Sequence, residues 1–278
     1  MAANVAARPA ERGRMLGNVA ARTLRYHARA LRWWALGTVG YILMYTSVWP
    51  SVRDNAAAYS STLESMPEAV RNLIGTDFGT PAGYLRAEMF TFVTPILMLI
   101  YAIGMGTRGL AGEEEAGTLD MLLATPVRRR RIVLDKFVAM AAGTAFLSGL
   151  TWVGVALLGP PFDLHVSLVS LAAAAVDLGL FALGFGAIGM ALGAATGSRS
   201  LALGASSGLA LVAFLIHTLA PSVHLLRPMR KATPLYFFLG HDPLTNGFNL
   251  LDLTVLTAIP LAALVFALWF FERRDLAV

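Results

Sequence analysis

The stretch Gly112–Lys136, GEEEAGTLDMLLATPVRRRRIVLDK, decides how the chain is organised. It is the longest densely charged run, and apolar stretches long enough to cross a bilayer lie on both sides of it. It also carries three leucines, Leu119, Leu122 and Leu123, whose i, i+3, i+4 spacing places them on one face of a helix. The pattern predicts a short helix that docks against another surface.

A solvated charged loop is the alternative interpretation of this stretch. It accounts for Arg128–Arg131, whose long side chains suit the membrane end of the next span. It does not account for the leucine face. In the helical interpretation, Glu113–Glu115 precede a helix at Thr118–Ala124, where acids favour the positive N-terminus, and Pro126 ends it.

The composition indicates a membrane protein. The 278 residues are 56% hydrophobic and 14% charged, whereas a soluble domain carries about 25% charged residues. At about 20 residues per span, the length allows about six spans. The absence of cysteine excludes a disulfide framework, a thiolate metal site and a cysteine nucleophile. The net charge of +5 does not indicate nucleic acid, because the basic residues gather beside the predicted spans.

The apolar stretches predict an all-α membrane protein with six transmembrane helices. A loose tail at 1–13 precedes a single transmembrane domain at 14–278. The predicted spans are about 33–52, 89–107, 132–158, 166–195, 201–220 and 251–271.

Three further features refine this topology. Trp33, Trp34 and Trp49 lie at the two ends of the first span, as aromatic residues of the membrane interface do. Pro95 predicts a kink in the second span. Residues 221–250 are long and proline-rich, which indicates a short re-entrant or interfacial element.

Residues 14–32 predict an amphipathic interface helix. One stripe of this helix is basic and the opposite face is mostly apolar. The basic stripe consists of Arg22, Arg25, Arg29 and Arg32. Two interpretations stay open: a juxtamembrane segment that holds anionic lipid, or a helix that also contacts a cytosolic partner.

The distribution of basic residues predicts the orientation. The N-terminus, the connection 108–136, the turn 197–200 and the C-terminus together hold 16 of the 22 Lys and Arg residues. The positive-inside rule places these segments in the cytosol, so both termini are expected there.

Close-packing signals occur in the fourth and fifth spans. Glycines spaced four apart allow helix backbones to approach closely in lipid. The pairs are Gly189–Gly193, Gly193–Gly197 and Gly204–Gly208. They either mark the closest helix pair, within one chain or across a dimer, or reflect the abundance of glycine in these spans.

Asp177 and His217 are ionisable residues inside predicted spans. Counted at 1.5 Å per residue from Thr196 and Arg199, they lie roughly 28 and 27 Å from the cytosolic ends of their helices. Two interpretations stay open: a polar pair at the outer end of a transport pathway, or two interfacial residues that reach headgroups or each other.

No pattern in the chain predicts catalysis. There is no GxxxxGK[ST], so the chain is not expected to bind ATP through a P-loop of its own. The five histidines are scattered without HExxH spacing, so no metal site is predicted. An intramembrane enzyme using Asp177 or His217 is the weakest hypothesis.

The charged stretch resembles the signature of ABC-2 type permeases, the membrane subunits of bacterial ABC exporters. The signature is E-x-x-x-G-T-L-[ED]-x-L-L-x-x-P-x-x-R with a later lysine. Three other segments resemble the sodium- and drug-extruding branch: SMPEAVRNLIG with TPAGYLRAEMF, then ATPLYFFLGHDPLTNG, and the tail FERRDLAV. The resemblance covers most of the chain from about residue 14 onward.

The resemblance implies a half-transporter of six spans in the bacterial plasma membrane. Its coupling helix would insert into a separate ABC ATPase, which binds ATP and Mg²⁺, so no cofactor is expected on this chain. A second permease, identical or related, would complete the complex. The coupling role carries over to Glu113, Glu114, Gly117, Thr118, Leu119, Asp120, Leu122, Leu123 and Pro126. The four-arginine run departs from the family's usual one or two, and it favours additional contact with anionic lipid.

An apolar bundle favours a hydrophobic or amphiphilic substrate, such as a drug, an antibiotic or a lipid. The alternative function is an ABC-like membrane module for envelope or protein assembly, without substrate flux.

Overall fold

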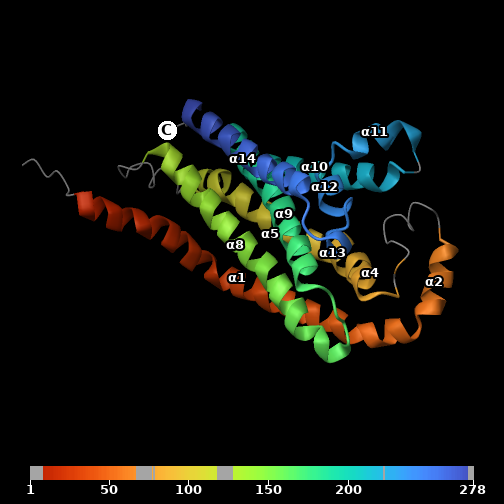
Figure 1. Cartoon of the computed structure of the whole chain (residues 1–278). Helices are drawn as coiled ribbons and strands as arrows, with labels where there is room; N and C mark the ends of the chain where they lie inside the picture. Colours follow the sequence, from red (N-terminus) through yellow and green to blue (C-terminus); the bar gives the residue numbers. More distant parts are fainter. Residues whose placement is uncertain (1–8, 67–76, 78, 118–127, 222, 275–278) are drawn as a thin grey trace, which may run out of the picture.

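The computed structural model describes residues 9–66, 77, 79–117, 128–221 and 223–274; at 9–27, 60, 63 and 64 it describes the backbone alone. Every regular element within these ranges is a helix (Figure 1). The longer helices are α1 (Pro9–Asp54), α5 (Thr94–Thr107), α8 (Arg129–Leu158), α9 (Leu168–Thr196), α10 (Arg199–Leu219) and α14 (Leu250–Arg273). The short ones are α2 (Ala56–Glu64), α4 (Pro81–Leu85), η1 (Arg86–Val93), η2 (Arg108–Gly112), α6 (Glu113–Glu115), η3 (Pro160–Phe162), η4 (His224–Leu226), α11 (Arg227–Arg230), α12 (Pro234–Leu239) and α13 (Pro243–Asn246).

Five helices of the described residues are long and apolar enough to cross a membrane. They are Pro81–Glu115, Arg129–Leu158, Leu168–Thr196, Arg199–Leu219 and Leu250–Arg273. These helices correspond to predicted spans two to six. The first predicted span, 33–52, lies in α1 and is not among the five, because its Trp, Tyr, Gly and Thr residues lower its hydropathy.

α1 is one continuous helix, whereas the sequence predicted a loose tail, an interface helix and a span in succession. It begins at Pro9, inside the predicted tail, because proline suits the first turn and Ala, Glu and Arg favour helix. Pro50 is the only proline in the helix interior. The second half of α1 packs along α8 (Figure 1).

The predicted basic stripe of α1 is partly described. Arg29 and Arg32 are exposed, and Arg32 Nε donates to the carbonyl of Ala28 at 3.3 Å. Leu31 and Trp34 pack against the bundle instead. The side chains of Arg22 and Arg25 lie outside the described residues.

α9 is the central helix of the bundle. α5, α8, α10 and α14 all pack against it (Figure 1). Two of the predicted glycines lie at these contacts: a Cβ on Gly189 would lie 3.0 Å from Thr107 Cγ2, and one on Gly193 would lie 3.3 Å from Ala111 Cβ. Gly204 and Gly208 have no heavy atom of the described residues within 4 Å of a Cβ position. The glycines of α9 are therefore packing positions within the chain.

The second span is a single helical run that contains two wide π-helical turns. η1 precedes Pro95, and Thr91 Oγ1 donates to the carbonyl of Arg86 at 2.7 Å within it. The sequence predicted a kink at Pro95, and the structure has the π-helical turn η1 just before it. Such a turn can accommodate the backbone N–H that proline lacks. The second wide turn, η2, leads into α6.

Short helices occupy the stretch predicted as a re-entrant or interfacial element. α12 and α13 pack against α9 near its first half (Figure 1). Phe238 of α12 stacks on Phe181 of α9, with ring centroids 5.2 Å apart and an interplanar angle of 17°. Arg86 forms an ion pair with Asp242 at 3.1 Å, which joins this stretch to the second span.

Candidate coupling site

The second-span helix ends in the three glutamates of α6. Ala116 N donates to the carbonyl of Gly112 at 3.2 Å, and Gly117 adopts a left-handed φ of 66° that ends the helix. The glutamates therefore lie at the C-terminus of the second-span helix, and the helix predicted after them at 118–124 lies outside the described residues. A helix C-terminus carries partial negative charge, so three carboxylates there are unfavourable unless positive groups offset them.

A basic residue of α8 compensates the negative charge of Glu113. Its carboxylate forms an ion pair with Lys136 Nζ, and the Lys136 side chain is only 9% exposed. A buried ammonium requires such a partner, because desolvation of an unpaired charge costs several kcal/mol, on the order of the whole stability margin of a domain. This contact fixes the start of α6 against α8.

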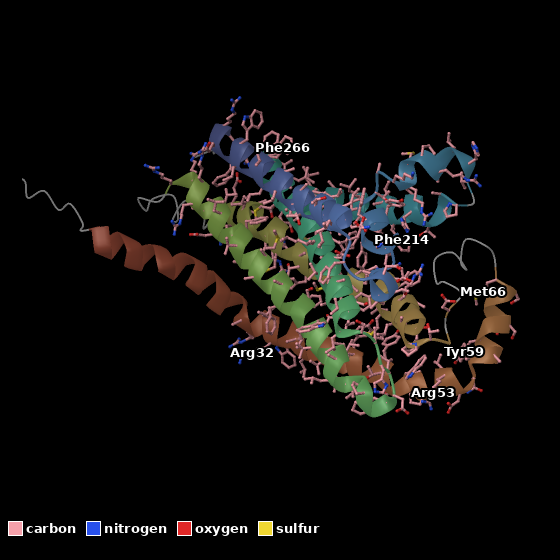
Figure 2. All side chains as sticks on the ribbon, viewed as in Figure 1. Arg32, Arg53, Tyr59, Met66, Phe214 and Phe266 are labelled. Carbon is pink, nitrogen blue, oxygen red and sulfur yellow. The ribbon has the colours of Figure 1, made fainter. Side chains whose placement is uncertain are left out.

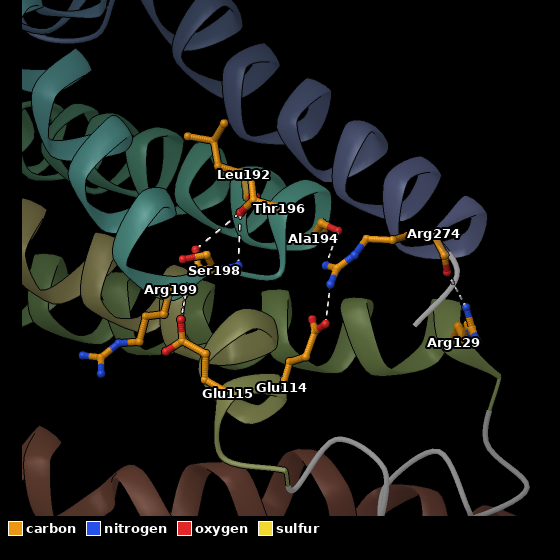
Figure 3. A network of polar contacts seen from close by, with 9 residues as sticks. All are labelled: Glu114, Glu115, Arg129, Leu192, Ala194, Thr196, Ser198, Arg199 and Arg274. Carbon is orange, nitrogen blue, oxygen red and sulfur yellow. Dashed lines mark hydrogen bonds and ion pairs between the residues drawn. The ribbon is translucent and has the colours of Figure 1, made fainter. Parts of the chain in front are cut away.

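An arginine at the end of α14 compensates the negative charge of Glu114. Its carboxylate pairs with Arg274 Nη2, and Arg274 Nη1 donates to the carbonyl of Ala194 in the last turn of α9 at 3.3 Å (Figure 3). The backbone carbonyl of Arg274 accepts from Arg129 Nη1 at 3.1 Å. One arginine thus joins α6, α8, α9 and α14.

The N-terminus of α10 compensates the negative charge of Glu115. The backbone N–H of Arg199 donates to Glu115 Oε1 at 2.8 Å (Figure 3). Ser198 caps the same helix by accepting from Leu201 N at 3.4 Å. A carboxylate is favoured at this position, because the first N–H groups of a helix lack intrahelical partners.

Three consecutive glutamates therefore contact three different helices. We call Glu113–Gly117 the root of the coupling segment, and the end of the bundle where these contacts lie the charged end. Lys136 is the lysine that follows the leucine motif, so its importance had a sequence signal. No sequence signal marked Arg274, because arginines beside the end of a membrane span are common.

The rest of the predicted coupling helix lies outside the described residues. These positions are Thr118, Leu119, Asp120, Leu122, Leu123 and Pro126. Of the predicted coupling residues, the structure describes Glu113, Glu114 and Gly117. The docking role of the leucine face stays a prediction.

Asp177 and His217 are both buried, at 3% and 6% exposure. Among the described residues, Asp177 Oδ1 and His217 Nδ1 have no hydrogen-bond partner. Asp252, in the first turn of α14, is a third buried acid, at 5% exposure, that sequence reasoning missed.

An apolar cavity of about 430 Å³ lies between α5, α10 and α12. Aromatic and branched aliphatic side chains form most of its wall, with Thr91 and Ser207 as its hydroxyl groups. Phe92 and Phe214 meet edge to face at its margin, with ring centroids 5.9 Å apart. Such a wall suits an apolar molecule.

The fold and the charged end together define a polytopic helical membrane protein in which the end of the apolar helix Pro81–Glu115 is held by ion pairs and hydrogen bonds to the bundle. The chain belongs to the ABC-2 transporter family: the family model described as ABC-2 family transporter protein matches residues 18–276. A comparison with curated proteins found no match. Membership makes this chain a permease subunit of an ABC transporter, a membrane transport component, and it implies an ABC ATPase partner.

Proposed function

We propose that the chain is the membrane-spanning permease subunit of an ABC exporter, which moves a hydrophobic or amphiphilic substrate outward. ATP is hydrolysed by a separate ATPase subunit. The observation that carries this proposal is the root: a segment held at once to α8, α9, α10 and α14 can pass a movement made outside the membrane to those helices.

In this proposal the coupling segment, residues 112–126, docks on the ATPase. The leucine face provides the apolar contact, and the root connects it to the spans. Nucleotide binding biases the segment between two docked positions, and the permease alternates between inward-open and outward-open states. The coupling residues are Glu113, Glu114 and Gly117 in the root, and Thr118, Leu119, Asp120, Leu122, Leu123 and Pro126 in the part that docks.

The proposed topology has six spans, with the charged end and both termini in the cytosol of a bacterial cell. The second half of α1 is the first span. Contacts with the second span support this: Tyr41 Oη lies 3.1 Å from Thr94 Oγ1, and Tyr84 Oη donates to the carbonyl of Tyr45 at 2.8 Å. Arg32 and Arg53 lie on either side of this segment (Figure 2).

Lipid and a second permease complete the proposed complex. The exposed Arg29 and Arg32 of α1 and the exposed Arg130 and Arg131 of α8 are proposed to contact anionic headgroups of the inner leaflet. The second subunit is another copy of this chain or a related permease. The apolar cavity between α5, α10 and α12 favours an apolar drug, antibiotic or lipid as the substrate.

The experiment compares two leucine variants after coexpression with the ABC ATPase that family membership implies as the partner. Leu122→Ala truncates one leucine of the leucine face, and Leu225→Ala changes a leucine that is 80% exposed in η4. We expect Leu122→Ala to lose ATPase copurification, while Leu225→Ala retains it. ATP-dependent dye accumulation in inside-out vesicles then tests export.

Two results would contradict this proposal. Flux by the permease alone, without nucleotide, would refute ATP coupling. ATPase activity without flux of any apolar dye or lipid analogue would favour the assembly module instead.

A further inference from the structure

We propose that Arg274, just after α14, is a positioning residue that holds the root of the coupling segment against α9 and α14, so that these helices move with the root. That α9 and α14 move with the root rests on the proposed function. That Arg274 holds the root in place can be tested on the permease alone.

Arg274 lies between two negatively polarised groups. Its guanidinium contacts the Glu114 carboxylate on one side and the Ala194 carbonyl on the other, at 3.3 Å (Figure 3). Glu114 belongs to the C-terminus of the second-span helix, and Ala194 belongs to the last turn of α9. One cation therefore offsets two helix C-termini at once.

The turn after α9 packs closely against this guanidinium. Gly197 has a φ of 67°, and a Cβ at this position would lie 2.0 Å from Arg274 Nη2. Any other residue would displace the arginine as well as strain the backbone. The positive φ therefore favours glycine at 197, and the absence of a side chain there leaves room for the guanidinium.

The chemistry of the site requires arginine in particular. A guanidinium presents several donors in a fixed fork, so it serves the carboxylate and the carbonyl together. A lysine at this position would have one ammonium for both acceptors. The backbone of Arg274 is itself held, because its carbonyl accepts from Arg129 at 3.1 Å.

A nearby ion pair provides a contrast. Arg130 of α8 pairs with Glu272 of α14, but its side chain is 67% exposed and this pair does not include the root. Loss of this pair should leave the root in place. Loss of Arg274 should release the root from α9 and α14 while its contacts with Lys136 and Arg199 remain.

The test uses pairs of spin labels in the naturally cysteine-free chain, purified in nanodiscs. The pair Ala116→Cys with Phe266→Cys measures the distance from the root to α14. The pair Ala116→Cys with Val138→Cys measures the distance from the root to α8. All three positions are exposed.

We expect Arg274→Gln to lose the single narrow distance peak between the root and α14, and to keep the peak between the root and α8. Arg274→Lys should be intermediate, and Arg130→Gln should match the parent in both pairs. Unchanged peaks in Arg274→Gln would overturn the proposal, and so would equal broadening of both pairs.

A second measurement tests whether α14 moves together with the root. In the complex with the ATPase, trapping with ATP and vanadate should leave the distance between the root and α14 constant in the parent, because the two move together. In Arg274→Gln the same distance should shift. A shift in the parent would overturn the transmission role, whereas failure of any ATPase to bind the parent would count against the proposed function and leave the nanodisc result standing.

Discussion

Gly106 of α5 and Gly186 of α9 pack backbone against backbone. A Cβ on Gly106 would lie 2.0 Å from the carbonyl oxygen of Gly186, and one on Gly186 would lie 2.8 Å from the carbonyl oxygen of Ala102. Only glycine allows so close an approach between two helices. This contact sets the separation of the second span from the central helix.

Gly106→Ala should therefore destabilise the bundle, by about 1–3 kcal/mol, because the added methyl must push α5 away from α9. Gly104→Ala is the matched control, since a Cβ there meets no described heavy atom within 4 Å. Thermal unfolding in detergent, followed by size-exclusion chromatography, measures both. Equal stability of the two variants would contradict the backbone contact.

The ion pair of Glu113 with Lys136 should behave as a buried pair. Glu113→Gln leaves the Lys136 ammonium poorly compensated, so we expect a loss of about 3 kcal/mol or more in unfolding free energy. The double variant Glu113→Gln with Lys136→Met should regain part of the loss, because no charge remains buried. A double-mutant cycle of unfolding free energies measures the coupling, and simple additivity would contradict it.

Labelling of introduced cysteines tests the proposed orientation. The chain has no cysteine of its own, so His165→Cys and Ser200→Cys give single labelling sites without background. Both positions are exposed and lie at opposite ends of α9. A membrane-impermeant maleimide should label position 165 in intact cells and position 200 only after permeabilisation. The reverse pattern would invert the topology.

Phe214→Ala should weaken binding of apolar molecules. Phe214 lines the cavity between α5, α10 and α12, and loss of a phenyl contact is worth about 1.4 kcal/mol, or about tenfold in Kd. Phe266→Ala is the control, because Phe266 is 58% exposed on α14 (Figure 2). Fluorescence titration with rhodamine 6G measures both variants. Equal affinities would exclude this cavity as the dye site.

Much of the fold follows from apolar run length. Spans two to six appear in the structure within a few residues of their predicted ends, except that the second run extends from Pro81 to Glu115. Sequence reasoning divided α1 into separate parts because the change from basic to aromatic composition resembles a boundary. The backbone contains no helix breaker there, so the helix continues through it.

The site was predictable only in part. The motif includes Glu113, Glu114 and Gly117, but sequence reasoning did not predict that the acids form the end of the second-span helix. Their partners come from α8, from the first residue of α10 and from the end of α14, far apart in sequence. Pairings over such separations depend on how the helices pack, which periodicity along the chain does not specify.

The wide turn η2 has a mechanical consequence for the root. Arg108–Gly112 separates the regular helix α5 from the glutamates, and its π-type turns interrupt the regular α-helical hydrogen-bond ladder. A torque applied at Gly117 would therefore be absorbed at η2 instead of bending α5. The glutamates could then tilt as a unit while the glycine contact between α5 and α9 stays closed.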